Sequence, residues 1–201
     1  GQGMSRGFIE GDMAEIWSEA EGCLKKAHEL NDNDFEVHRL MAEVNLSGRN
    51  FRVAERHASK AYKMVPNDPR VLSVYGEVSL RLGKIDQGLE ALKLALEIDP
   101  IAQGKTNSDS RTSPVLFGEY LARNKDNCLE LVEKLEDIDP KSWLLTAKLC
   151  SDEEHNITEE DWYKRGKEEF KDKDWATEVD SFRLNNEGAK ESLIEFAESL
   201  S

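Results

Sequence analysis

The chain has 201 residues, enough for one extended helical domain or for one domain with a small appendage. Charged residues make up 34% and aromatic residues 7%, which suits an elongated helical protein better than an enzyme with one large core. The formal net charge of −14 argues against nucleic acid as a partner, because phosphate binding needs a basic surface.

The distribution of charged and apolar residues indicates where the acidic residues lie and which compartment the protein occupies. Residues 35–100 hold nine acidic and ten basic side chains, net +1, whereas residues 151–180 hold twelve and five, net −7. No apolar run approaches the ~20 residues of a membrane span, and no signal peptide opens the chain, so we expect a cytoplasmic protein without a membrane partner.

Cys23, Cys128 and Cys150 have no paired spacing, so neither a disulfide framework nor a metal or cofactor site is expected. Cys128 is expected to be a packing residue.

The first segment reads as an incomplete repeat. Gly1-Gln2-Gly3 looks like a cloning remnant, and residues 4–13 are too short and too rich in glycine for a full helix. Trp17, Ala20, Leu24 and Ala27 then predict a helix that ends before residues 31–34. Because this helix is not preceded by a full partner helix, we expect the chain to be a fragment of a longer protein.

Residues 35–66 and 68–100 each predict two antiparallel helices, because their apolar residues fall three or four apart. Gly48 and Gly83 are expected to end the first helix of each pair. Pro69 can open a helix at its first turn, and Asp86 is expected to cap the helix that follows Gly83.

A period of 34 residues links these pairs, and it predicts small side chains where helices approach closely. The recurring positions are Ala20, Ala54 and Gly88, then Ala27, Ala61 and Ala95, then Pro66 and Pro100. These residues resemble the tetratricopeptide repeat. The resemblance implies an all-α, right-handed superhelix of stacked antiparallel helix pairs, with a general role in binding proteins.

After residue 100, residues 101–113 are predicted to form a longer loop, and Gly104-Lys105-Thr106 lacks the context of a phosphate loop. A fourth pair is expected over 113–140, and another helix over 142–150. The array would thus span 1–150, with repeats at about 4–34 (partial), 35–67, 68–101 and 113–140.

Residues 151–201 predict a helical cap with one face on the array and one in water. Thr158 is expected to begin a capping box for a helix through Phe170, and a last helix is expected over 187–200. Five residues of this section form a pattern: Trp175, Glu178, Phe182, Leu193 and Phe196. Their arrangement resembles the tail that follows tetratricopeptide repeats in some bacterial class III nucleotide cyclases. This resemblance implies an alternative function, a regulatory or scaffolding region of a larger signalling protein.

The repeat resemblance also implies a partner-binding groove, because set positions of the first helices face the concave side. The candidate residues are Arg39, Glu43, Leu46, Arg70, Ser73, Glu77, Leu80 and Arg81. We expect a mixed-charge groove for a peptide or helix carrying both signs, with Leu46 and Leu80 giving apolar contact. Glu43 and Glu77 stand where the chaperone-binding subclass has Asn, which argues against capture of a C-terminal carboxylate. The competing interpretation is that these arginines and glutamates only pair with one another.

Nothing in the sequence predicts catalysis, so we expect a non-enzymatic interaction module. His28, His38, His57 and His155 are scattered singly along the chain, and His28 and His57 are expected to be structural. The identity of the protein partner and the possibility of a homo-oligomer stay open.

Overall fold

The computed structural model describes residues 13–100, 109–135, 137–182, 184 and 186–200. Over these residues the regular elements are all α-helices and no strand occurs. The helices are α1 (Met13–Leu30), α2 (Phe35–Ser47), α3 (Phe51–Met64), α4 (Pro69–Arg81), α5 (Ile85–Ile98), α6 (Asp109–Leu121), α7 (Lys125–Glu133), α8 (Pro140–Asp152), α9 (Asp161–Glu169), α10 (Trp175–Ser181) and α11 (Glu187–Ser199).

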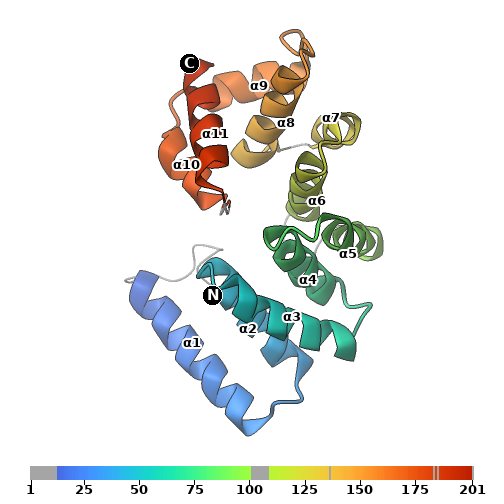
Figure 1. Ribbon diagram of the computed structural model, residues 1–201, viewed down its shortest axis with the longest axis vertical. Helices are drawn as coiled ribbons and strands as arrows, with labels where there is room; N and C mark the ends of the chain where they lie inside the picture. Colours follow the sequence, from blue (N-terminus) through green and yellow to red (C-terminus); the bar gives the residue numbers. More distant parts are fainter. Residues whose placement is uncertain (1–12, 101–108, 136, 183, 185, 201) are drawn as a thin grey trace.

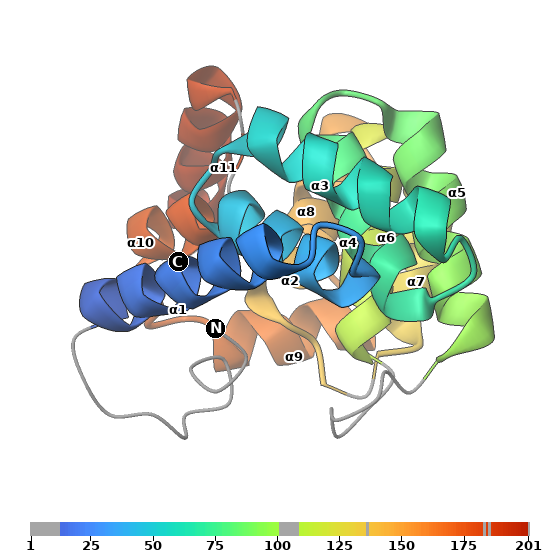
Figure 2. The same ribbon diagram turned by 90° about the horizontal axis from the view of Figure 1, so that it is seen from below.

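The helices follow one another in an arc that runs from α1 to α11 (Figure 1). Neighbours in sequence pack together as α2 with α3, α4 with α5 and α6 with α7, and each pair also touches the next. Figure 1 places α4 and α6 on the inner side of the arc and α5 and α7 on the outer side. In the view from below, α1 lies across α2, with which it is in contact (Figure 2).

The 34-residue period marks the joints between helices, as the sequence predicted. Ala54, Ala61 and Ala95 are at most 1% exposed. Gly88 on α5 faces Gly76 on α4 so closely that a Cβ atom on either would come within 2.9 Å of the other's carbonyl oxygen. A side chain at either glycine would therefore force the two helices apart.

One hydrophobic core runs from α4 to α11, so the C-terminal helices share their buried surface with the array. Its centre is Trp143 on α8, which is 2% exposed and lies against the rings of Tyr163, Phe170 and Trp175. Because α8 contacts α6 and α7 on one side and α9 to α11 on the other, it joins the two parts of the core.

Several helices begin after an aspartate whose side chain accepts backbone hydrogen bonds from the first turn. Asp34, Asp68 and Asp139 each cap a helix in this way, and Pro69 occupies the first turn of α4 as predicted. Gly83, which follows α4, has the expected left-handed backbone with φ of 76°. The repeated caps set the first turns of α2, α4 and α8.

Gly48 follows the last residue of α2, as predicted, but the left-handed residue there is Arg49, with φ of 60°, while Gly48 has φ of −79°. Two predictions about helix starts were wrong. Lys84 precedes α5, so Asp86 lies inside its first turn rather than capping it. Thr158 does not cap α9, because its backbone N–H and its hydroxyl both donate to the side-chain oxygen of Asn156, and the helix begins three residues later.

The predicted loop over 101–113 is too long, because α6 already begins at Asp109 and contains Pro114. The polar residues at the start of α6 resemble a loop in sequence, but Arg111 among them is 8% exposed and anchored to α4 and to the end of α5. Predictions about residues 1–12 and Gly104-Lys105-Thr106 lie outside the described residues. In the part of the chain described, no helix has the length and apolar character needed to cross a bilayer.

Candidate partner-binding surface

Arg39 on α2 is the centre of a charged cluster at the start of the arc. Its Nε and Nη2 donate to the two carboxylate oxygens of Glu36 at 2.9 and 2.7 Å, and its Nη1 donates to Glu43 at 2.5 Å. The spacings of three and four residues place all three side chains on one helix face. The Arg39 side chain is only 2% exposed, whereas those of Glu36 and Glu43 are 35% and 38% exposed. The two carboxylates are therefore exposed to solvent here, and the guanidinium lies buried beneath them.

Arg70 connects this cluster to the next repeat. Its Nη2 donates to Asp68 at 2.8 Å, and its Nη1 lies 3.5 Å from Glu36, 34 residues earlier. Burial alone would raise the pKa of Asp68, but hydrogen bonds from the Arg70 side chain and from the backbone N–H groups of Arg70 and Val71 hold it below its usual range. The hydrogen bond from Arg39 lowers the pKa of Glu36 as well.

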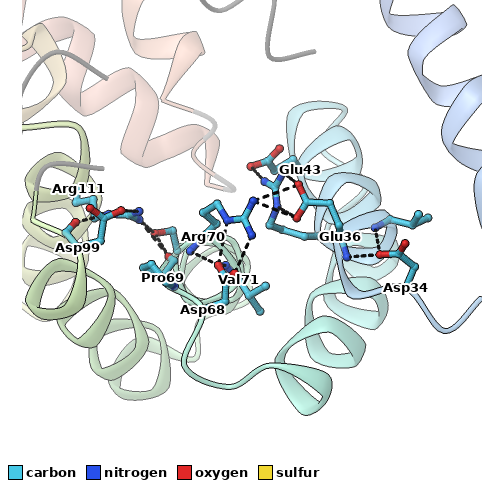
Figure 3. A network of polar contacts seen from close by, with 12 residues as sticks. Asp34, Glu36, Glu43, Asp68, Pro69, Arg70, Val71, Asp99 and Arg111 are labelled. Atoms are coloured by element: carbon cyan, nitrogen blue, oxygen red, sulfur yellow. Dashed lines mark hydrogen bonds and ion pairs between the residues drawn. The ribbon is translucent and has the colours of Figure 1, made fainter. Parts of the chain in front are cut away.

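Arg111 on α6 continues the chain of polar contacts, although no sequence pattern predicted its role. Its Nη2 donates to the Asp99 carboxylate at 2.6 Å, and its Nη1 donates to the Pro69 carbonyl at 3.1 Å and to the Ser73 hydroxyl. Figure 3 shows these contacts strung from α2 across the start of α4 to α6. The first helices are thus joined by side chains that reach from each repeat to the next, and these contacts bring Arg39, Glu43, Arg70 and Ser73 into one surface.

Glu77 stands apart from this pairing, and its charge acts on Glu43, which is paired with Arg39. Burial raises the pKa of Glu43, Arg39 opposes that effect, and the charges of Glu77 and Glu36 raise the pKa further. No cation pairs with Glu77 among the described residues. The side of α2 and α4 near Glu43 and Glu77 therefore carries an excess of negative charge.

The expectation that Leu46 and Leu80 offer apolar contact to a partner was wrong, because both are buried, at 6% and 3% exposure. Leu80 fills the space beside Gly88 and Gly118, and Leu46 packs in the cluster of α2, α3 and α4. Arg81 is also buried, with its guanidinium 4.2 Å from the centre of the Phe117 ring. These three candidates stabilise joints between repeats.

The expectation of scattered histidines was wrong for three of the four. His28, His38 and His57 come together from α1, α2 and α3, with ring centres 5.0 to 5.5 Å apart. His155 is exposed in the link before α9. In the described part of the chain, no group of three or more His, Cys, Asp or Glu side chains is arranged to hold a metal ion. Cys128 is fully buried, as expected for a packing residue, and burial raises the pKa of its thiol to about 12.

Two solved structures resemble this arrangement over most of its length. The crystal structure of MamA superposes with a TM-score of 0.62 at 13% identity, covering 82% of this chain and 98% of that one. PilF of Pseudomonas aeruginosa superposes with a TM-score of 0.62 at 17% identity, covering 96% of this chain and 83% of that one. Both are tetratricopeptide-repeat proteins. The chain has the tetratricopeptide-repeat solenoid fold.

Sequence comparison adds a relation over part of the chain. "Cellulose synthase operon protein C" of Pseudomonas fluorescens (strain SBW25) is 28% identical in an alignment of 111 residues that covers 52% of this chain. The chain spans 9% of the length of that protein. No family model matches the chain. The two superpositions show the fold, and none of these relations supports the likeness of the C-terminal section to cyclase tails.

Proposed function

We propose that this chain is a non-enzymatic interaction module and that the inner side of α2 and α4 binds a partner segment carrying charges of both signs. The observation that carries the proposal is the uneven pairing on this surface. Arg39 and Arg70 are matched by Glu36, Glu43 and Asp68, while Glu77, whose charge raises the pKa of Glu43, has no cation paired with it among the described residues. A cationic side chain of the partner beside these glutamates would relieve the repulsion between them.

Charge complementarity also indicates how the partner would be held. The Arg70 side chain is 41% exposed and can donate to a carboxylate of the partner in addition to those of Asp68 and Glu36. Ser73 lies one turn further along α4, half-buried, and its hydroxyl donates to the Pro69 carbonyl. Because Leu46 and Leu80 are buried, polar contacts would provide the specificity of this surface.

Charge reversal at Glu77 tests the proposal. Proteins captured from cell lysate by the wild type should be lost, by about tenfold or more, in a Glu77→Lys variant, because a lysine would repel the partner's cation. Glu90→Lys is the matched control, since Glu90 is exposed on α5, on the outer side of the arc. Quantitative mass spectrometry of the captured proteins provides the measurement. Equal capture by wild type, Glu77→Lys and Glu90→Lys would contradict binding at this surface.

A further inference from the structure

Three imidazoles meet where α1 joins the first complete helix pair. Nδ1 of His38 lies 2.8 Å from Nδ1 of His57, and Nε2 of His38 lies 2.9 Å from the carbonyl oxygen of Asp32. His38 is 2% exposed. Nδ1 of His28 is shielded from solvent and has no hydrogen-bond partner.

These contacts define the proton positions of the neutral pair. A carbonyl oxygen only accepts hydrogen bonds, so Nε2 of His38 carries a proton and its Nδ1 is bare. Nδ1 of His57 must then carry a proton and donate it to His38. One added proton can be taken by Nε2 of His57 without breaking this hydrogen bond, but a second, on Nδ1 of His38, would place two N–H groups face to face at 2.8 Å. The packed arrangement therefore resists full protonation of the pair.

The surrounding charges act in the same direction. Lys60 and Arg56 on α3 and His28 on α1 lie near the pair, and the Asp32 carboxylate is 3.5 Å from Lys60. Burial, followed by the charges of His38, His28, Arg56 and Lys60, lowers the pKa of His57 from 6.5 to about 4. Burial also lowers the pKa of His38, against the opposing hydrogen bond to Asp32.

We propose that His28, His38 and His57 form a proton-sensitive joint that holds α1 on α2 and α3 at neutral pH and releases it in mild acid. Among the helices, α1 has its principal contact with α2, so little else retains it. A histidine whose pKa is lowered in the packed state stabilises packing above its ordinary value of 6.5. That stability is lost as the pH falls from 6.5 toward 4. Release of α1 would uncover the surface of α2 and α3 that it covers.

Hydrogen exchange tests the proposal in the whole chain. After correction for intrinsic exchange rates, backbone protection in α1 should fall by at least about tenfold relative to α5 between pH 7 and pH 5. His57→Asn keeps a donor near the position of Nδ1 but cannot titrate, so it should retain most of the protection at pH 5. His155→Asn, a change at an exposed histidine outside the joint, should behave as wild type.

Two results would overturn the proposal. One is α1 protection that follows α5 at every pH, and the other is an undiminished loss in His57→Asn. The wild type offers an independent measurement by NMR titration of the histidine ring protons. Midpoints for His38 and His57 should lie below 6.5, and midpoints at or above 6.5 would also contradict the proposal.

Discussion

Trp143→Ala should lower the free energy of unfolding by about 3–5 kcal/mol, the typical cost of removing a large buried aromatic side chain. Trp143 is 2% exposed and stacks on Tyr163 and Trp175, with ring centres 5.7 and 5.8 Å away. Its indole N–H donates to the Tyr163 carbonyl at 3.2 Å. Because this ring joins α8 to the C-terminal helices, its loss leaves a cavity bordered by several helices.

Urea denaturation followed by circular dichroism provides the measurement for Trp143→Ala. Trp143→Phe should cost less, because it keeps part of the ring, and Leu30→Ala should change stability by no more than ~0.5 kcal/mol. Leu30 is 80% exposed and serves as the surface control. A loss below about 1 kcal/mol for Trp143→Ala would show that α8 does not join the two parts of the core.

Gly88→Ala should destabilise the protein by about 1–3 kcal/mol through overpacking at the crossing of α4 and α5. A Cβ at Gly88 would come within 2.7 Å of the Leu80 side chain and 2.9 Å of the Gly76 carbonyl oxygen. The carbonyl belongs to the backbone, so it can withdraw only if the helices separate. The same denaturation measurement applies.

Gly22→Ala is the matched control for that crossing. Gly22 lies in α1 with no atom within 4 Å of its missing Cβ, so alanine should be neutral or should stabilise by up to ~1 kcal/mol through its higher helix propensity. Opposite signs at the two glycines would support the close approach at Gly88. Equal effects would contradict it.

The sequence predicted the repeat joints because close helix approach limits residue identity directly. Ala54, Ala61, Gly88 and Ala95 had to be small, and their period of 34 residues is visible without coordinates. The division into repeats at 35–67, 68–101 and 113–140, with a cap over 151–201, stays a prediction, since α8 shares its core with both parts.

The polar surface was less predictable because burial depends on neighbouring helices. Arg39 could be expected to pair with Glu36 and Glu43 from their helical spacing, but its near-complete burial could not. Leu80 is buried because the missing side chains of Gly88 and Gly118 leave space for it. Predicting this burial would require knowing how the three helices pack together.

Two features had no periodic signal at all. Arg111 lies in a polar stretch that resembles a loop, and its role depends on where α6 begins relative to Asp99. His38 and His57 are 19 residues apart along the chain and meet only through the packing of α2 against α3. Such contacts arise from tertiary structure, so repeat matching cannot detect them.

Site-specific photo-cross-linking tests the central claim, that a partner binds the inner side of the arc, most directly. A benzophenone amino acid at position 70 on α4, where the Arg70 side chain is 41% exposed, should cross-link a partner protein in cell lysate. The same amino acid at position 90, exposed on the outer helix α5, should give no such product. A cross-linked partner at position 90 with none at position 70 would contradict binding at the inner surface.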